Sequence, residues 1–416
     1  MDLIIGAGIT GLSYAAFCNH KDYILIEREK EIGGYCKTTV KNGFVWDYSG
    51  HFFHFKDKSI KDFVMKNMNM ENIVEVTKTT HIKYKNRFID YPFQKNIHQL
   101  SKKELIDCLY DLFAKEERNY NNFKEMLYTK FGKSIAEKFL IPYNSKLYAC
   151  DLNSLDKDAM GRFFPYAEKE EIILNFKRKE NGSYNKTFMY PKTGAISYIN
   201  SVCKNLDMSK IRTNTGIISI DKTNKTARLS DDTIIKYDRI ISTIPFPDLL
   251  EKAGIDYNKD IYNWNKVLVF NLGFNIGSPD IKSHWIYMPE NKYCFYRVGL
   301  YNNILSQDRV SLYVEIGFSK SEDINPREWL KKVLDDLKLA QIITDKHILT
   351  DYESIIMDPA YVHISSCSNE DVRIKKELLA KNDIYSIGRY GSWCYCSIED
   401  NIKEAQDLAQ KLNTYE

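Results

Sequence analysis

Residues 2–27 read DLIIGAGITGLSYAAFCNHKDYILIE, and this stretch decides the fold. A short apolar run, typical of a buried strand, leads directly into a G-x-G-x-x-G turn at residues 6–11. A helical segment follows, and a second apolar run at residues 23–26 ends in Glu27. Strand, glycine turn, helix, strand and acid, in this order, are the layout of a dinucleotide-binding unit.

Three glycines and one acid have distinct roles in such a unit. Gly6 permits the tight turn, Gly8 lets the backbone approach a pyrophosphate, and Gly11 lets the helix pack closely on the strand. The helix N-terminus attracts the phosphate charge, and Glu27 is placed to accept hydrogen bonds from a ribose. The alternative is a glycine-rich turn in an ordinary α/β domain, which we disfavour because the required context is present on both sides.

The composition is ordinary for a soluble globular protein. The chain has 416 residues, of which 44% are hydrophobic and 28% charged, so we expect two or three domains with a sizeable core. A net charge of +3 is too close to balance to favour nucleic acid or an anionic membrane as a partner. No apolar run approaches the length of about 18 residues that a membrane span needs, so we expect none.

Nine cysteines are spread from Cys18 to Cys396. Their number is odd and no secretory signal precedes the glycine turn, so we expect free thiols and a cytoplasmic protein. Cys394 and Cys396 are close in the sequence, but no second ligand pair has the spacing of a zinc site. We interpret these two cysteines as structural.

A histidine segment, SGHFFH, spans residues 49–54. His51 and His54 are three residues apart and could ligate a metal, but no acidic or cysteine partner lies at a suitable spacing. We therefore expect no metal, and we interpret the segment as one that lies beside a cofactor.

The middle of the chain divides into a helical part and a strand-rich part. Ser101 and Glu104 form a capping-box signature, and helical periodicity follows over about 40 residues. Residues 266–318 alternate as short strands, which predicts an antiparallel sheet. A helix is expected over residues 329–340, before a strand near Ile348.

The end of the chain returns to the first unit. Residues 383–389 are typical of a buried strand that ends in Gly388 and Arg389, and Ser397 and Ile398 open a final helix. A helix N-terminus after a strand and a glycine turn is a second anion site. This segment is therefore expected to complete the site that begins at Gly6, so that the first domain is discontinuous.

The whole chain resembles UDP-galactopyranose mutase and related sugar-nucleotide mutases, within the larger group that includes flavin amine oxidases and protoporphyrinogen oxidases. The glycine turn, Glu27 and the pair Gly33-Gly34 are shared by that whole group. The features similar to the mutases are more particular: they are the histidine segment and residues 91–93, 142–148 and 387–400.

The resemblance implies an α/β fold with a discontinuous Rossmann-type FAD-binding domain, a helical insertion and an antiparallel β-sheet substrate domain. The expected boundaries are 1–79, 192–247 and 370–416 for the first, 97–165 for the second, and 80–96, 166–191 and 248–369 for the third.

The resemblance also implies an unusual reaction. Reduced FAD would act through its N5 as a nucleophile on the anomeric carbon of an NDP-sugar, and the N5–sugar adduct would let the sugar interconvert between pyranose and furanose forms. NAD(P)H or another external reductant is expected to keep the flavin reduced. Such an enzyme would serve surface polysaccharide biosynthesis, and a homodimer is one assembly that the resemblance allows. The sugar, the nucleotide base, the reductant and the oligomeric state stay open.

The motifs and the resemblance together give a set of candidate site residues. The catalytic candidates are His51 and Arg297, beside the flavin itself. The residues expected to bind the cofactor are Gly6, Gly8, Ile9, Thr10, Gly11, Glu27, Arg28, Gly33, Gly34, Tyr35, Gly50, His51, Ile218, Gly388, Arg389, Ser397 and Ile398. Those expected to bind the substrate are Tyr143, Tyr148, Arg162, Tyr184, Arg297, Tyr361 and Tyr395.

Arg297 has a reason of its own for inclusion. It lies in FYRV, residues 295–298, an alternating strand that can direct it into a cleft. A lone arginine between apolar strand residues needs an anion, which we interpret as the diphosphate of the nucleotide.

Two other functions stay open. A flavin oxidase or dehydrogenase of the amine-oxidase or protoporphyrinogen-oxidase type would need an apolar substrate tunnel and no arginines for a diphosphate. A non-catalytic flavin-binding protein is disfavoured by the histidine segment. A mutase needs reduced flavin but shows no net redox turnover, whereas an oxidase consumes oxygen, so the two enzymes can be told apart.

Overall fold

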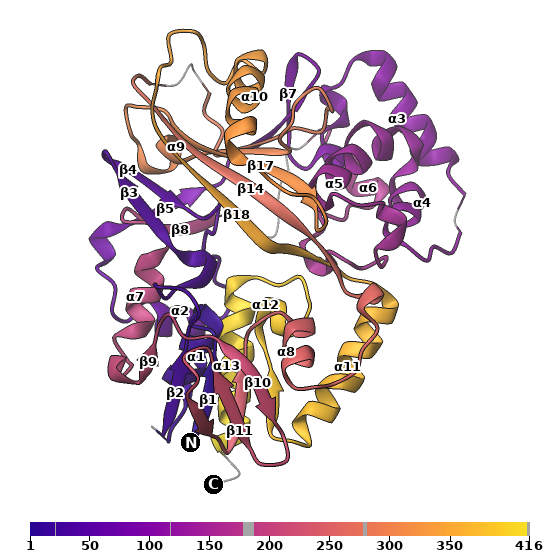
Figure 1. Cartoon of the computed structure of the whole chain (residues 1–416). Helices are drawn as coiled ribbons and strands as arrows, with labels where there is room; N and C mark the ends of the chain where they lie inside the picture. The colour runs from indigo at the N-terminus through magenta and orange to yellow at the C-terminus, as the bar shows by residue number, and fades with distance from the viewer. Residues whose placement is uncertain (21, 117, 178–186, 278–280, 414–416) are drawn as a thin grey trace.

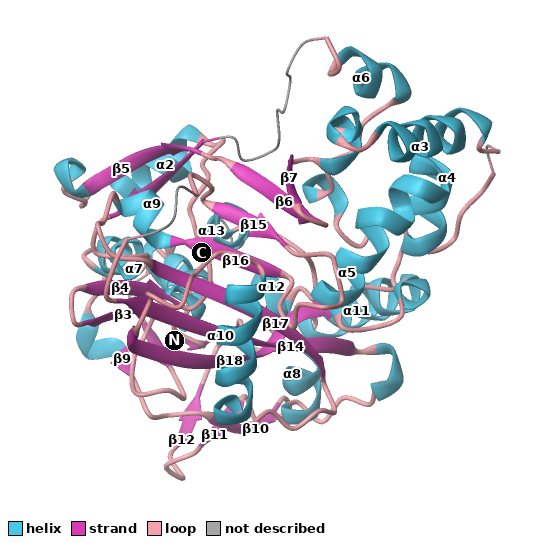
Figure 2. Ribbon diagram, turned by 90° about the horizontal axis from the view of Figure 1, so that it is seen from above, coloured by secondary structure: helices cyan, strands magenta, loops and turns pink. Residues whose placement is uncertain are grey.

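The computed structural model describes residues 1–20, 22–116, 118–177, 187–277 and 281–413. It consists of a Rossmann-like half, a large mixed sheet and a group of helices at one end of that sheet (Figures 1 and 2). The predicted α/β fold with a helical insertion and a mainly antiparallel sheet is confirmed. The domain boundaries drawn from the sequence stay a prediction, and Tyr184 lies outside the described residues.

Among the described residues, five parallel strands form the sheet of the Rossmann-like half, in the order β19-β13-β1-β2-β9. The chain returns to this sheet three times after its first two strands, and the last return, near residue 384, is one that the sequence predicted. The strands are β1 (Asp2–Ile5), β2 (Tyr23–Ile26), β9 (Ile211–Arg212), β13 (Arg239–Ser242) and β19 (Ile384–Ser386).

Both faces of the parallel sheet are covered because side chains alternate along each strand. Ile4 packs with helices on one face, whereas Leu3 and Ile5 pack on the other. The first face carries α1 (Ile9–Phe17), α2 (Lys58–Met65), α7 (Ile196–Cys203) and α13 (Ile398–Asn413). The second carries β10 (Ile217–Asp221), β11 (Thr226–Leu229), β12 (Ile234–Lys236), α8 (Phe246–Lys252) and α11 (Ser366–Ala380), and α12 (Gly388–Gly391) follows β19.

A second sheet of seven strands crosses the middle of the molecule, in the order β18-β14-β17-β16-β15-β6-β7 (Figure 2). Its pairs are antiparallel except for β15 and β6, which run parallel. The helices α9 (Tyr301–Leu305) and α10 (Pro326–Leu339) belong to the same part of the chain. The strands are β6 (Thr80–Tyr84), β7 (Arg87–Asp90), β14 (Asn263–Phe274), β15 (Trp285–Tyr287), β16 (Arg297–Leu300), β17 (Ser311–Ser319) and β18 (Leu349–His363).

The helical insertion is built from α3 (Lys102–Ala114), α4 (Phe123–Ile135) and α5 (Ile141–Tyr148), with α6 (Lys169–Leu174) packed against the same core (Figure 2). The predicted capping box is present at the start of α3, where Ser101 and Glu104 each accept a backbone N–H from the other.

Two sheets of two strands each complete the description of the strands. Asn42 and Gly43 make the turn between β3 (Thr38–Lys41) and β4 (Phe44–Asp47), and both have positive φ. The pair of β5 (Ile73–Thr77) and β8 (Thr187–Pro191) is also antiparallel. In the described part of the chain, no helix is both long enough and apolar enough to span a membrane.

Candidate cofactor and substrate site

A cavity lies where the Rossmann-like half meets the seven-stranded sheet. Its walls come from the glycine turn, the histidine segment, the central strands of the large sheet and the segment before α13. Its volume is about 1380 Å³, which exceeds the roughly 300–1,000 Å³ of a typical small-molecule site. The cavity therefore has room for more than one ligand of ordinary size.

The glycine turn presents an open cradle to this cavity. A Cβ atom placed on Gly8 would meet nothing within 4 Å, whereas one on Gly11 would lie 2.1 Å from the carbonyl oxygen of Gly6. Gly8 thus leaves free space at the cavity wall, and Gly11 is required for packing. The second glycine turn adjoins the first, because the N–H of Gly33 donates to Ala7 at 2.8 Å and a Cβ on Gly34 would lie 3.3 Å from Gly8 Cα.

Glu27 is held rigidly at the end of β2. Its two carboxylate oxygens accept backbone N–H groups from Ala7 at 2.8 Å and from Glu29 at 2.9 Å, and the residue lines the cavity. Arg28 lies beside it, with an exposed side chain that pairs with Glu29 at 3.5 Å. Ile218 of β10 lines the same end of the cavity and is 49% exposed.

The end of the chain meets the glycine turn through Asn401 of α13. The Asn401 side-chain oxygen accepts the Thr10 hydroxyl at 3.1 Å and the Arg389 backbone N–H at 2.7 Å. Gly388 has a φ of 84°, and a Cβ there would lie 2.7 Å from the Thr10 hydroxyl oxygen. Ser397 caps α13. The sequence predicted this meeting of the two chain segments but missed Asn401, which lies mid-pattern in an amphipathic helix.

Arg389 places a positive charge at the part of the cavity wall that the end of the chain forms. Its guanidinium lies 4.8 Å from the ring centre of Tyr395, 5.3 Å from Tyr361 and 6.0 Å from Tyr390, and it donates to the carbonyl of Cys396 at 3.1 Å. Burial works against its charge, but the neighbouring tyrosine hydroxyls raise its pKa above the ordinary value. No carboxylate of the described residues forms an ion pair with it.

Arg297 already has its anion within the protein. It lies opposite Glu315 in the register of β16 and β17, and the guanidinium holds this carboxylate with two bonds, Nε–Oε2 of 2.7 Å and Nη2–Oε1 of 2.6 Å. Glu315 is 1% exposed and also accepts the hydroxyl of Ser49. The need for an anion inferred from the sequence is therefore met by Glu315. The sequence did contain a sign of this pairing, because Glu315 is the single acid in the apolar run of β17.

His51 is a neutral imidazole at the cavity wall. Burial, and then the charge of Arg389, lowers its pKa to about 4. Its Nδ1 atom is buried and has no hydrogen-bond partner within the protein. Gly50 cannot carry a side chain, because a Cβ there would lie 2.3 Å from the hydroxyl of Tyr313. The histidine segment therefore brings backbone and an unpaired ring nitrogen close to the cavity.

The predicted substrate tyrosines divide into two groups. Tyr361 and Tyr395 line the cavity, with their rings stacked at 5.9 Å and 17°. Tyr148 lies behind Tyr361, with ring centres 5.9 Å apart, and Tyr143 packs on Tyr287 at 4.9 Å. Tyr143 and Tyr148 belong to the core of the helical insertion and do not reach the wall of the cavity as described.

Arg162 lies outside the cavity wall, next to a residue that is part of it. Its half-exposed guanidinium holds Asp400 at the start of α13, with Nη2–oxygen distances of 2.5 and 2.7 Å. Phe163, its neighbour, lines the cavity and packs edge-on against Tyr395 at 5.0 Å. The helical insertion thus contacts the cavity through Phe163 while Arg162 fixes it to α13.

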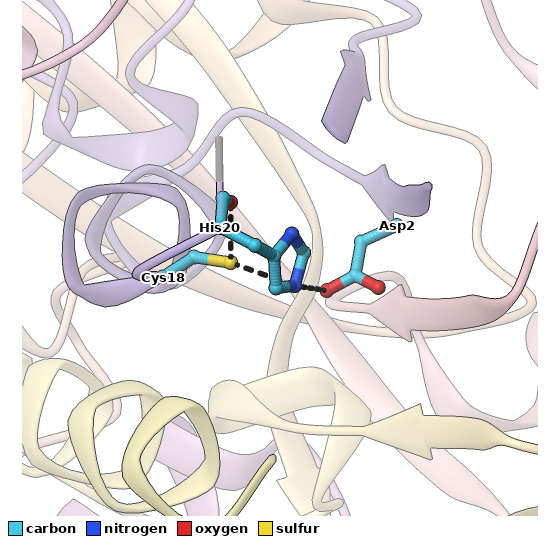
Figure 3. A group of neighbouring side chains, drawn as sticks. All are labelled: Asp2, Cys18 and His20. Carbon is cyan, nitrogen blue, oxygen red and sulfur yellow. Dashed lines mark hydrogen bonds and ion pairs between the residues drawn. The ribbon is translucent and has the colours of Figure 1, made fainter. Parts of the chain in front are cut away.

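A separate cluster of potential metal-ligating side chains lies at the other end of β1, where Asp2, Cys18 and His20 point toward one another (Figure 3). His20 Nε2 is 3.2 Å from Asp2 Oδ2 and 3.1 Å from Cys18 Sγ. Arg239 also donates to Asp2 Oδ1 at 2.9 Å and lies 3.1 Å from His20 Nε2. Since the guanidinium supplies the positive charge here, we interpret the cluster as a structural tie between β1, α1 and β13.

The residues around the cavity fit a dinucleotide cofactor. The open space at Gly8, the fixed carboxylate of Glu27 and the unpaired Nδ1 of His51 each leave a place that a ligand can fill. Two of the predicted residues, Gly11 and Gly388, act through packing, because a side chain at either would meet neighbouring atoms.

Comparison with known proteins agrees with this geometry. The family model for an NAD(P)-binding Rossmann-like domain matches residues 4–66. A crystal structure of reduced UDP-galactopyranose mutase is similar over 100% of this chain and 94% of its own, with a TM-score of 0.93 and 24% identity. A proposed protoporphyrinogen oxidase from Exiguobacterium sp. 255-15 covers 100% of this chain and 99% of its own, with a TM-score of 0.80 and 16% identity.

Coproporphyrinogen III oxidase of Staphylococcus aureus (strain NCTC 8325 / PS 47) is a curated relative. It is 26% identical over 294 residues, which are 61% of this chain and 62% of the oxidase. The match therefore spans less than two thirds of that enzyme's length. The chain has the fold of the UDP-galactopyranose mutase structure, as the resemblance predicted, and the structure from Exiguobacterium shares that fold.

Proposed function

We propose that this protein is an FAD-dependent sugar-nucleotide mutase that interconverts the pyranose and furanose forms of an NDP-sugar. The observation that carries the proposal is one cavity that joins the cradle at Gly8 to a cluster of arginine and tyrosine side chains. Its volume of about 1380 Å³ accommodates a dinucleotide together with a nucleotide sugar. The fold shared with UDP-galactopyranose mutase supports the same assignment.

FAD would be held by the two glycine turns and by the end of the chain. The backbone at residues 6–11 and the start of α1 would bind the pyrophosphate, and Glu27 would accept a ribose hydroxyl. The bound cofactor, in its reduced form, supplies the nucleophile for the anomeric carbon. The protein's own task is then to position the sugar and to neutralise the diphosphate.

Two arginines would share the diphosphate in different ways. Arg389 contributes a positive charge that no described carboxylate balances, and the rings of Tyr361 and Tyr395 hold it in place. Arg297 is oriented by Glu315 and also hydrogen-bonds to Tyr287, and it keeps its remaining N–H donors for a ligand. Glu315 thus acts as a positioning residue, because it also bonds to Ser49 beside the predicted flavin edge.

His51 would orient the reactive edge of the cofactor. With a pKa of about 4 it stays neutral at pH 7, so it offers one ring donor and one ring acceptor without adding charge. The unpaired Nδ1 is available for such a bond.

The test is a screen of NDP-sugars against dithionite-reduced protein, with pyranose-to-furanose conversion followed by chromatography. A mutase converts at least one of them and consumes no oxygen with it. Absence of conversion for every sugar, together with oxygen consumption on an apolar substrate, would overturn the proposal.

A flavin oxidoreductase is the second candidate. The match to coproporphyrinogen III oxidase over 61% of this chain favours it. Arg297, Glu315 and Arg389 argue only against an oxidase of a purely apolar substrate, because such a substrate has no use for charged groups in the cavity wall. The proposal further includes a cytoplasmic enzyme of surface polysaccharide biosynthesis, reduced by NAD(P)H or another external reductant and assembled as a homodimer. Sedimentation of the purified protein would test the dimer.

A further inference from the structure

Two thiols lie one residue apart at the wall of the cavity. Cys394 and Cys396, in the segment between α12 and α13, are hydrogen-bonded to each other. Both are partly exposed, and Cys396 lines the cavity. All nine cysteines of the chain are described and none forms a disulfide, and Cys18, Cys36, Cys108 and Cys203 are buried. Each thiol of the pair is thus accessible to solvent and has a second thiol beside it.

The surroundings of the pair favour a reactive thiolate at Cys394. The hydrogen bond from Cys396 lowers the pKa of Cys394, and the nearby charges of Arg389 and Lys376 act in the same direction, against burial and Glu404. The same hydrogen bond raises the pKa of Cys396. Reactive cysteines typically occupy electropositive and partly exposed places of this kind. Cys394 is therefore the thiol that attacks a small disulfide, and Cys396 is placed to displace the small thiol from the resulting mixed disulfide.

We propose that Cys394 and Cys396 are a redox-modification site that closes reversibly to an intramolecular disulfide in exchange with a low-molecular-weight disulfide such as glutathione disulfide. The thiolate of Cys394 attacks one sulfur of the small disulfide, which forms a mixed disulfide and releases one thiolate. Cys396 then loses its proton to solvent and displaces the second thiolate. Two cysteine thiols are oxidised to one disulfide, and one small disulfide is reduced to two thiols.

Closure would act on the ligand cluster through Tyr395, which lies between the two cysteines. The Tyr395 ring stacks on Tyr361 and covers the guanidinium of Arg389, whose Nη1 atom donates to the Cys396 carbonyl. A disulfide across one residue forces that residue's backbone into a small ring, so the Tyr395 ring must leave this arrangement. The oxidised protein would then bind an anionic nucleotide more weakly, a consequence that rests on the proposed function.

The disulfide itself is tested without ligand or cofactor. Full-length protein is equilibrated in glutathione buffers of rising oxidised-to-reduced ratio, quenched in acid, alkylated and mapped by mass. One tryptic peptide, residues 390–403, carries both cysteines. In wild type we expect this peptide to lose about 2 Da, to resist alkylation and to revert with dithiothreitol. Wild-type protein that carries glutathione adducts without ring closure would overturn the proposal.

Single variants separate the two roles. Cys396→Ser should trap a glutathione adduct on Cys394, whereas Cys394→Ser should react much more slowly at Cys396, by about tenfold or more. Cys367→Ser removes an exposed cysteine outside the pair and should leave ring closure unchanged. Equal reactivity of the two remaining thiols would contradict the assignment of Cys394 as the attacking group.

The coupling to ligand binding is measured by equilibrium dialysis of UDP with the oxidised and the reduced protein. We expect at least fivefold weaker binding to the oxidised form. Equal binding to both forms would overturn the coupling. Failure of UDP to bind either form would count against the proposed function and not against the disulfide, which is read by mass alone.

Discussion

The pairing of Arg297 with Glu315 decides what a substitution at Arg297 would do. Glu315 is 1% exposed, so Arg297→Ala leaves a buried carboxylate without its cation. Breaking such a pair typically lowers the free energy of unfolding by about 3–5 kcal/mol. We therefore expect a large loss of stability in urea unfolding, in addition to any loss of nucleotide binding.

Two controls give this prediction its meaning. Arg297→Met combined with Glu315→Gln removes both charges and should recover most of the lost stability. Arg162→Ala breaks an ion pair with Asp400 whose partners are 48% and 33% exposed, and it should change stability by only about 0–1 kcal/mol. If Arg297→Ala is as stable as Arg162→Ala, the two bonds to Glu315 contribute nothing measurable.

Gly8 and Gly11 form a matched pair of sites for a second prediction. Gly8→Val should fold normally, since φ is −76° and its Cβ meets nothing within 4 Å, but it should no longer retain FAD because the side chain occupies the cradle. Gly11→Val should instead fail to fold stably, because its Cβ would lie 2.1 Å from a backbone oxygen. Circular dichroism and flavin absorbance of the two purified proteins check both outcomes. A Gly8→Val protein that is still yellow would contradict the prediction that the flavin binds at Gly8.

The sequence predicted the local roles of single residues better than it predicted which residues they contact. The glycine roles follow from the turn itself, and the need of Arg297 for an anion follows from its apolar strand neighbours. That the anion is Glu315 depends on the register of β16 and β17, which no local pattern in the sequence fixes. For the same reason, Asn401 could not be connected with Thr10 from the sequence.

Lys146 joins the helical insertion to the large sheet. From α5, its Nζ atom donates to the carbonyl oxygens of Met288, Glu290, Tyr293 and Phe295, at 2.7, 3.2, 3.0 and 2.6 Å. These carbonyls lie in the connection between β15 and β16, and β16 begins at Arg297. A single ammonium group therefore orders the connection that leads into the candidate site.

Lys146→Met should loosen that connection. The side chain keeps its length but loses its three N–H donors, and four carbonyl groups lose the ammonium group that they share, so we expect the free energy of unfolding to fall by about 2–4 kcal/mol. Hydrogen exchange should accelerate at residues 288–297 more than elsewhere. Lys103→Met, on the exposed side of α3, is the control and should leave both measurements unchanged. Unaltered exchange in Lys146→Met would show that the connection orders itself.

Elements with strong end signals were predicted well, and elements without them were not. The capping box at Ser101 and the turn at Asn42-Gly43 are short-range signals, and both features are present. The sequence indicated only a strand near Ile348, whereas β18 runs for 15 residues. β18 lies at the edge of its sheet, where a proline is tolerated because one side of the strand makes no ladder hydrogen bonds. Pro359 therefore interrupts the sequence pattern by which a strand is predicted.

Three histidines give the whole protein a sensitivity to mild acid. Burial lowers the pKa of His51, His54 and His363 to about 4 in the folded state, from an ordinary value near 6.5. Between these values the unfolded chain binds more protons, so stability falls as the pH drops from about 6.5 toward 4. Burial raises the pKa of Asp47 to about 6, so protonation of this carboxyl favours the folded state and offsets one histidine over much of the same range.

The net expectation is a loss of roughly 1–3 kcal/mol of unfolding free energy per pH unit below about pH 6, since each uncompensated histidine contributes about 1.4 kcal/mol per unit. Urea unfolding at pH 7, 6 and 5 measures it. His363→Gln, which can still donate to the carbonyl of Tyr148, should make the dependence shallower without changing stability at pH 7 by much. A stability that is flat between pH 7 and 5 would contradict the burial of these imidazoles.

The return of the chain to its first sheet has a consequence for synthesis on the ribosome. β13 offers an open edge, with Ile240 and Ile241 in the core, from the time it emerges until β19 arrives. At typical elongation rates the interval is on the order of ten to thirty seconds. The hydrogen bond from Thr10 to Asn401 forms later still, because Asn401 lies near the end of the chain. A nascent chain therefore passes most of its synthesis with an unpaired sheet edge and with the wall around Gly8 incomplete. Chaperones have their longest access during this window, and the dinucleotide that we propose for the site can be captured only near its close.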